Sequence, residues 1–339
     1  MTITVLNSGM LSSIQDLGRH GFQKHGVIVS GAMDSYSLRI GNLIVGNKEE
    51  EAGLEITLLG PTLLFENDML IAITGGDLSP VIEGRSVPLW RPVLVKKGSV
   101  LNFGKIKSGC RAYLCVAGGF TVPEMLNSKS TYLRARMGGY KGRALKTGDR
   151  IEINSISHLS EKLIIKLQNN KALDAFTTTN WFVDFHKFIT FSNEYRIRIL
   201  AGNHFSMCST NSQMNFYTGK YTVTPQSDRM GYRINGPEVK LNEKCELLSE
   251  AVTFGTIQLP PDGNPIILVA DRQTTGGYPK IAQVVSADLS LIAQIKPGEI
   301  ISFQESTLQE AEYLIIQKEK GMRELDIFLK MKINENRFN

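Results

Sequence analysis

Short apolar runs alternate with turns rich in Gly, Pro, Asp and Asn along most of the chain. Runs of this length and composition are typical of β-strands. In the first half they predict strands at residues 2–6, 54–58, 69–74, 93–95, 100–103, 112–117 and 150–153. In the second half they predict strands at residues 196–200, 221–224, 239–241, 266–270 and 300–303.

A few stretches have helical spacing instead. Residues 34–45 predict a helix with Asp34 as its N-cap and Gly46 at its end. Shorter helices are expected at residues 209–217 and 287–295. Residues 307–332 predict a long helix, because Leu308, Ala311, Ile315, Met322, Leu325 and Leu329 recur at helical steps.

The long C-terminal helix has a start signal in Thr307 and Glu310, which are spaced as a capping box. Its apolar stripe has two interpretations. The stripe packs on the chain's own domain, which we favour, or it forms a docking surface for a partner.

The length of 339 residues is enough for two domains. Residues 154–195 are polar and lack the regular turn pattern, so we predict a boundary near residue 160. The expected organisation is a β-rich domain at 1–160, a second at 161–306 and a helical extension at 307–339. The fold class is therefore mostly β, with a few short helices.

Composition and charge exclude several classes of protein. Hydrophobic residues make up 42% and charged residues 21%, which is ordinary for a globular protein. The net charge of +5 is spread along the chain, so a nucleic-acid partner is not expected. No apolar run approaches the roughly 20 residues of a membrane helix. With no leader-like N-terminus and no regular pattern among Cys110, Cys115, Cys208 and Cys245, we expect a cytoplasmic protein with reduced thiols.

Familiar catalytic motifs are missing from the sequence. It contains no GxxxxGK[ST] loop, and no GxGxxG or GxSxG in the required strand–turn–helix setting. The five histidines form no HExxH pair, and no metal site is expected.

Three segments instead combine Asp, Arg and Gly within a few residues. The first, residues 13–34, contains Asp16 and Arg19 and then Ser30, Gly31 and Asp34 before the predicted helix. A small-residue turn at a helix N-terminus suits a carboxylate or phosphate. Simple capping of the helix is the alternative for Ser30, Gly31 and Asp34.

The second segment, residues 227–237, contains Asp228, Arg229 and Tyr232. The third, residues 269–280, follows the most apolar predicted strand. It comprises Asp271, Arg272, Gln273, Thr274, Thr275, Gly276, Gly277 and Tyr278. Polar groups at the end of a buried strand need partners, either in a ligand or in a structural turn. If the three segments meet in one cleft, they form a site for an anionic substrate.

Longer motifs carry a resemblance to a known family. IQDLGRHG, SGAMD, GGYKGRALKTGD, SDRMGYRINGP, GTIQLPPDG and DRQTTGGYPKIAQV resemble the signatures of the C-type subunit of 5-oxoprolinase. The same family includes allophanate hydrolase subunit 2, biotin-dependent carboxyltransferase-like proteins and KipA, which antagonises a kinase inhibitor. The resemblance covers residues 3–303 and leaves out the C-terminal helix.

The resemblance implies two cyclophilin-like β-barrel domains and two partners. One partner is a cyclophilin-fold protein similar to KipI and to the B-type subunit of 5-oxoprolinase, and the other is similar to its A-type subunit. Such an assembly cleaves 5-oxo-L-proline to L-glutamate with hydrolysis of ATP, using Mg²⁺. On this basis Arg272 and Arg229 are expected to clamp an anion, with Asp271 as base or as the group that orients an arginine. The other site residues named above are expected to bind substrate.

Two other functions stay open at this stage. The chain could be a carboxyltransferase similar to that of urea carboxylase, which would require biotin on a carrier. It could also be a KipA-type regulator that binds a KipI-like inhibitor of a histidine kinase.

Overall fold

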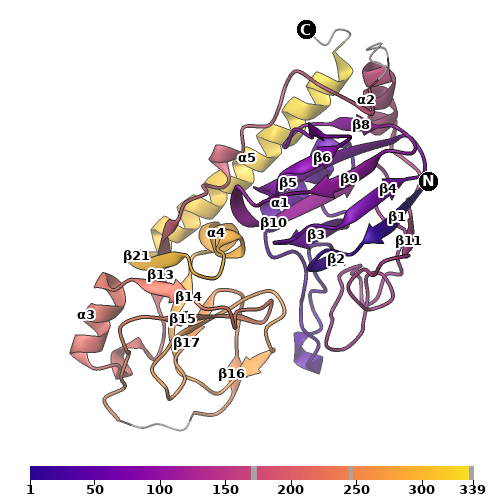
Figure 1. Cartoon of the computed structure of the whole chain (residues 1–339). Helices are drawn as coiled ribbons and strands as arrows, with labels where there is room; N and C mark the ends of the chain where they lie inside the picture. Colours follow the sequence, from indigo (N-terminus) through magenta and orange to yellow (C-terminus); the bar gives the residue numbers. More distant parts are fainter. Residues whose placement is uncertain (169–173, 244–246, 336–339) are drawn as a thin grey trace. The chain divides into compact units, whose positions relative to one another are not determined.

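The computed structural model describes residues 1–168, 174–243 and 247–335. By its internal contacts the chain divides into two units, which are described separately. Unit 1 comprises residues 1–19, 34–190 and 320–339, and unit 2 comprises residues 20–33 and 191–319. The prediction of a mostly β protein is confirmed (Figure 1).

Unit 1 is built on two six-stranded sheets. The first has the order β11 (Arg150–Glu152), β1 (Thr2–Asn7), β4 (Thr62–Phe65), β9 (Val100–Phe103), β6 (Pro80–Ile82) and β7 (Arg85–Ser86). The second has the order β12 (Phe176–Thr178), β8 (Val93–Val95), β5 (Met69–Asp77), β10 (Ser108–Val116), β3 (Gly53–Thr57) and β2 (Leu11–Gln15). Hydrogen bonding therefore gives this unit two sheets, where the resemblance had implied a barrel.

The core of unit 1 lies on one face of each sheet. Alternate residues of neighbouring strands, such as Leu54, Ile56, Ala112 and Leu114, belong to a single buried apolar cluster. The opposite face of β5 and β10 is covered by α1 (Ser35–Ile44), whose N-cap is Asp34 as predicted. The Asp34 carboxylate accepts a hydrogen bond from the backbone N–H of Ser37 at 3.1 Å.

Unit 2 contains a closed seven-stranded barrel. Around the barrel the order is β13 (Glu194–Ala201), β20 (Lys280–Val284), β17 (Thr256–Gln258), β18 (Ile266–Leu268), β15 (Gly231–Asn235), β14 (Tyr221–Val223) and β21 (Ile300–Glu305). The barrel closes through the parallel pairing of β21 with β13. A separate two-stranded ribbon joins β16 (Glu250–Ala251) to β19 (Thr275–Gly276).

Three predicted helices appear near their expected bounds: α3 (Thr210–Thr218), α4 (Leu289–Gln294) and α5 (Leu308–Asn334). The Thr307 hydroxyl accepts from the backbone N–H of Glu310 at 3.2 Å, so half of the capping box forms. The Glu310 carboxylate accepts instead from the Ser306 hydroxyl at 2.7 Å.

Residues 154–195, for which no element was predicted, contain α2 (His158–Gln168) and β12; Ser157 caps α2 by accepting from the N–H of Ser160 at 3.1 Å. Both elements belong to unit 1, so the contact-based division falls after residue 190 and not near 160. The prediction of a strand at residues 239–241 was wrong. The Val239 N–H donates to the Gly263 carbonyl and the Lys240 N–H to the Ser212 hydroxyl of α3, leaving one isolated bridge between Leu241 and Cys208.

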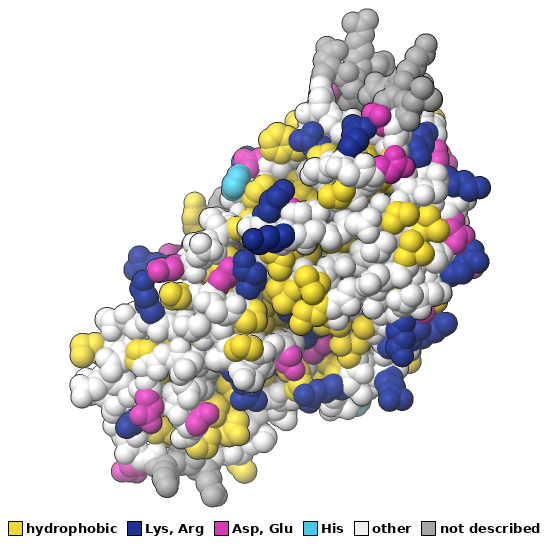
Figure 2. Space-filling view, in the orientation of Figure 1, with side chains coloured by type: hydrophobic (Ala, Val, Ile, Leu, Met, Phe, Trp, Pro, Cys, Tyr) yellow, Lys and Arg dark blue, Asp and Glu magenta, His cyan; other side chains and the backbone are white. Residues whose placement is uncertain are grey.

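On the face shown in Figure 2, Lys and Arg side chains are interspersed with Asp and Glu rather than gathered in one field. None of the helices described is long and apolar enough to span a bilayer. Cys110, Cys115 and Cys208 are buried thiols, whereas Cys245 lies outside the described residues. Burial raises the pKa of Cys208 to about 11, so this thiol stays protonated at neutral pH.

Candidate functional site

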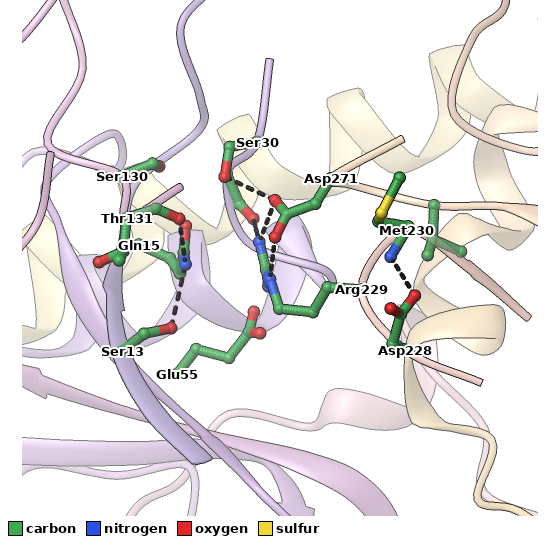
Figure 3. Close-up of polar contacts among 12 residues, drawn as sticks. Ser13, Gln15, Ser30, Glu55, Ser130, Thr131, Asp228, Arg229, Met230 and Asp271 are labelled. Atoms are coloured by element: carbon green, nitrogen blue, oxygen red, sulfur yellow. Dashed lines mark hydrogen bonds and ion pairs between the residues drawn. The ribbon is translucent and has the colours of Figure 1, made fainter. Parts of the chain in front are cut away.

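A buried ion pair between Arg229 and Asp271 is the centre of the candidate site in unit 2 (Figure 3). The guanidinium donates from Nε to Asp271 Oδ2 at 2.9 Å and from Nη2 to Asp271 Oδ1 at 3.0 Å. Each residue is only 5% exposed. This two-pronged geometry fixes the plane of the guanidinium as well as its position.

The barrel brings these two residues together. Arg229 lies just before β15 and Asp271 just after β18, and these two strands are antiparallel neighbours. The pairing continues past the strand ends, where the Asp271 N–H donates to the Arg229 carbonyl at 2.7 Å. The second and third Asp–Arg–Gly segments of the sequence are thus joined by the sheet itself.

Part of the first segment also reaches this pair. The Ser30 hydroxyl donates to Asp271 Oδ1 at 2.6 Å, and Arg229 Nη2 donates to the Gly31 carbonyl at 2.6 Å. Ser30 has a φ of 57° and Gly31 a φ of 90°, which places both in the left-handed region. A serine in this region is uncommon, and such strain often occurs at functional sites.

Arg272 is also buried but has a different environment. Its Nε and Nη1 donate at 3.4 Å to the carbonyls of Val252 and Val269, and no carboxylate among the described residues lies within ion-pair distance. Burial lowers the pKa of Arg272 to about 10, although the charge of Asp271 opposes the shift. At neutral pH the side chain is therefore a buried cation whose charge is not balanced by an ion pair.

The residues after Arg272 leave this cluster. Thr275 and Gly276 form β19, and a Cβ at Gly276 would lie 2.4 Å from the Gln258 amide nitrogen, so a larger residue there would displace that side chain. Gly277 and Tyr278 line a separate cavity of about 940 Å³, which has Leu259, Pro260 and Pro279 among its other walls. Gln273 and Thr274 lie half-buried between Arg272 and β19.

Asp228 and Tyr232 flank Arg229 in the sequence, and their contacts are those of a turn and of the barrel core. Asp228 is exposed and accepts from the N–H groups of Met230 and Gly231 at 2.7 and 3.2 Å, an Asx turn that leads into β15. Tyr232 belongs to the apolar core of the barrel.

Asp16, Arg19 and Asp34 belong to unit 1. Asp16 accepts from the Ser128 hydroxyl at 2.7 Å and also from the Ser130 hydroxyl, and Arg19 donates to the Ser130 carbonyl. These bonds hold the loop at 128–131 against β2. For Asp34 the helix-capping alternative is the one observed.

A second polar cluster, which the sequence did not reveal, lies on the sheet of unit 1. Ser13, Glu55 and Tyr113 stand side by side on β2, β3 and β10, and Gln15, Thr57 and Arg111 flank them. We call these six residues the Glu55 face. All six are buried. In the sequence these polar residues alternate with core residues, and this alternation was the signal that could have revealed them. The same alternation is typical of a strand whose polar side faces solvent, so it does not predict a buried polar face.

Within the Glu55 face, the Glu55 carboxylate contacts the side chains on the neighbouring strand. Glu55 accepts from the Tyr113 hydroxyl at 2.8 Å and lies 3.7 Å from Arg111 Nε. Burial, reinforced by the charges of Glu55 and Asp34, raises the pKa of Tyr113 well above its usual value. The Gln15 amide donates to Ser13 Oγ and the Thr131 carbonyl at 3.0 and 3.2 Å (Figure 3), but its Oε1 accepts no hydrogen bond. This buried oxygen is an acceptor for which the described part of the chain supplies no donor.

Neither cluster resembles a metal centre. Within the described ranges, no group of three His, Cys, Asp or Glu side chains is arranged to hold a metal ion. What the clusters offer is fixed hydrogen-bond donors and, at Arg272, an unbalanced positive charge.

Comparison with known families gives these residues a context. Residues 25–305 match the model of the carboxyltransferase domain, subdomains A and B. This chain belongs to that carboxyltransferase-domain family. The match includes the whole barrel of unit 2 and ends before α5.

Two bacterial members of this carboxyltransferase-domain group are similar over nearly their full length. The chain is 38% identical to the C-type subunit of 5-oxoprolinase from Haemophilus influenzae and 37% identical to that from Escherichia coli. Each comparison covers 91% of this chain and 93% of the relative. The crystal structure of Kluyveromyces lactis urea carboxylase also matches, with a TM-score of 0.85 and 32% identity over 96% of this chain but 29% of that one.

Proposed function

We propose that this chain is the C-type subunit of an ATP-dependent 5-oxoprolinase and helps to cleave 5-oxo-L-proline to L-glutamate. The supporting observation is the similarity to two proteins of that name, which extends over 93% of their length. Urea carboxylase, by contrast, is matched over less than a third of its chain. We therefore favour the 5-oxoprolinase subunit over the urea carboxylase.

In this proposal Arg272 binds the substrate carboxylate. A buried guanidinium without an ion pair is unfavourable in the protein alone, and a carboxylate would balance its charge through paired hydrogen bonds. The lowered pKa of about 10 still leaves the group protonated at neutral pH. Its neighbours Gln273 and Thr274 and the amides of Gly276 and Gly277 are proposed to complete the binding loop.

Arg229 and Asp271 are assigned different roles. Both oxygens of Asp271 already accept hydrogen bonds from Arg229, and one accepts from Ser30 as well. A carboxylate held in this way is a poor base, so its proposed role is to orient Arg229. The second anion clamp is then Arg229, whose guanidinium plane is held in a fixed orientation by Asp271 and the Gly31 carbonyl.

In this proposal ATP and Mg²⁺ are used by the assembled enzyme and are not assigned to a site on this chain. A lactam resists attack by water, and phosphorylation of its amide oxygen by ATP would make the carbonyl carbon reactive. The described residues do not suit a magnesium site, because no three ligand side chains converge. We therefore assign no step on this chain to the metal or the nucleotide.

The proposed partners are a KipI-like protein, equivalent to the B-type subunit of 5-oxoprolinase, and a protein equivalent to the A-type subunit. They are proposed to work with this chain in the cytoplasm. The relatives are named as one subunit of an enzyme, which supports the existence of other subunits. Complex formation is tested by co-expression, with elution as one species from a size-exclusion column as the expected result. Separate elution at micromolar concentration contradicts the assignment of the partners.

Carboxyl transfer from carboxybiotin is the second candidate function, favoured by the family model and by the urea carboxylase structure. The two functions differ in what they consume. Oxoproline-dependent ATP hydrolysis by the reconstituted assembly supports 5-oxoprolinase. Activity that needs a biotinylated carrier and urea supports carboxyl transfer and overturns our proposal.

A further inference from the structure

The solvent-exposed face of α5 carries a stripe of large apolar side chains. Met322, Leu329 and Ile333 occupy the buried side of the helix. On the other side lie Tyr313, Ile316, Ile327, Phe328 and Met331, each between 56% and 63% exposed. Five large exposed apolar side chains on one face of a helix are unusual in a monomer and mark an interaction surface.

The stripe is interrupted at its middle by a pair of opposite charges. Lys320 and Glu324 lie one turn apart and are both 66% exposed, with a separation of 3.9 Å between charged atoms. The apolar residues lie on either side of this turn: Tyr313 and Ile316 before it, and Ile327, Phe328 and Met331 after it. The sequence of the exposed face is therefore nearly symmetric about position 322.

Such a pattern is complementary to itself when one helix is reversed. In an antiparallel pair centred at position 322, Lys320 of one copy faces Glu324 of the other, and the contact occurs twice by symmetry. Tyr313 then faces Met331, and Ile316 faces Phe328. A parallel pair would place Lys320 against Lys320, which is unfavourable.

The charges outside the stripe also favour antiparallel packing. The first turns of the helix contain Glu310 and Glu312, and the last turns contain Lys330 and Lys332. Antiparallel packing brings the acidic start of one helix beside the basic end of the other, and it also opposes the two helix dipoles.

We propose that α5 forms a homodimer contact with α5 of a second copy of this chain, in antiparallel orientation. The contact from Tyr313 to Met331 would be about 27 Å long. With on the order of 100 Å² from each apolar side chain, it buries roughly 1,000 Å² in total, the lower limit for a specific interface. We therefore expect a dimer of micromolar affinity. The inference is independent of the enzymatic proposal, since α5 lies outside the family match.

Sedimentation equilibrium of the purified full-length chain tests the affinity. The wild type is expected to dimerise, and Ile316→Asp or Phe328→Asp to raise the dimer dissociation constant at least about tenfold, as one buried apolar contact is replaced by a charge. Ile165→Asp is the matched control, since Ile165 is an exposed apolar residue of α2. It should leave the constant unchanged. A wild type that stays monomeric at about 100 μM overturns the proposal.

Cysteine cross-linking tests the orientation. A mixture of Lys320→Cys and Glu324→Cys chains is expected to form a disulfide-linked dimer under mild oxidation, whereas either variant alone links poorly. The native Cys110, Cys115 and Cys208 are buried and should not interfere; the wild-type chain serves as control for Cys245. Efficient linking of each variant with itself would indicate parallel packing and contradict the proposal. If the two cysteine variants instead form disulfide-linked species only with a different protein of the assembly, that result also contradicts the proposal of a homodimer.

Discussion

Arg229 and Arg272 are two buried guanidinium groups of one unit with opposite surroundings. Arg229 has a carboxylate partner in Asp271, whereas Arg272 donates only to two carbonyl oxygens at 3.4 Å. The first arrangement stabilises the folded chain, and the second costs free energy until an anion binds. Substitutions at the two positions should therefore separate stability from activity.

For Arg272, we expect Arg272→Met to lower kcat/KM of the reconstituted assembly while leaving Tm unchanged or raised. The loss of a charge-assisted clamp should be about 2–3 kcal/mol, or roughly 30- to 150-fold. Arg272→Lys should already reduce activity, because it keeps the charge but loses the planar fork. A fall in Tm that parallels the fall in activity would mean that Arg272 has a structural role.

For Arg229, we expect Arg229→Ala to destabilise the chain by about 3–5 kcal/mol, because it leaves the Asp271 carboxylate buried without a cationic partner. Chemical denaturation of the single chain measures this. Arg85→Ala is the matched control: its ion pair with Asp174 is about half exposed and should contribute less than about 1 kcal/mol. If Arg229→Ala and Arg85→Ala lower the free energy of unfolding by similar amounts, the buried Arg229–Asp271 pair does not have the structural role assigned to it.

At the scale of elements, the loop that precedes β11 is held by Arg143 and Asp149. Arg143 Nη1 and Nη2 donate to the two oxygens of Asp149 at 2.6 and 2.7 Å. This hydrogen bonding, opposed by burial and aided by the Lys146 N–H, lowers the pKa of Asp149. The loop is joined to β1, where the Val5 N–H donates to the Asp149 carbonyl at 2.8 Å.

A pH dependence of stability follows from this pair. Because the pKa of Asp149 is lower in the folded chain, its contribution is fully present above the ordinary aspartate pKa of about 4. The contribution is lost as the pH falls through the lowered value. We expect Asp149→Asn to cost about 1–2 kcal/mol at pH 7 and to flatten the acid limb of a stability–pH curve. An unchanged acid limb would mean that the pair contributes nothing to stability.

Element prediction succeeded where a local signal was strong. The Asp34 cap and the apolar spacing of 35–44 specified α1, and helical periodicity specified α5. It missed α2, although Leu159, Leu163 and Leu167 recur there at four-residue steps. It failed at residues 239–241, because a short extended segment becomes a strand only when a neighbouring strand is available to pair with it.

At the scale of the molecule, the sequence pointed to the chemistry of unit 2 more readily than to that of unit 1. Arg229 and Asp271 lie in conspicuous Asp–Arg–Gly segments, and an antiparallel strand pair brings them together. Gln15, Glu55 and Tyr113 lie on separate strands that resemble any half-exposed sheet. Their grouping depends on strand order, which residue types alone do not specify.

The proposal of a shared enzyme makes a prediction for the isolated chain. The sequence lacks a P-loop, and the relatives are named as one component of a larger enzyme. We expect the purified chain alone to show no oxoproline-dependent ATP hydrolysis above background. A coupled assay of ADP release measures this, and robust turnover by the single chain would contradict a mechanism shared among several proteins.

The most direct measurement for the central claim is the same ADP-release assay with this chain, its proposed A-type and B-type partners, ATP, Mg²⁺ and 5-oxo-L-proline. The account predicts that ADP and L-glutamate are formed together, and that omission of this chain or its replacement by the Arg272→Met variant sharply reduces both. Glutamate formation that proceeds equally well without this chain would contradict the account, as would a complete assembly that hydrolyses ATP only with urea and a biotinylated carrier.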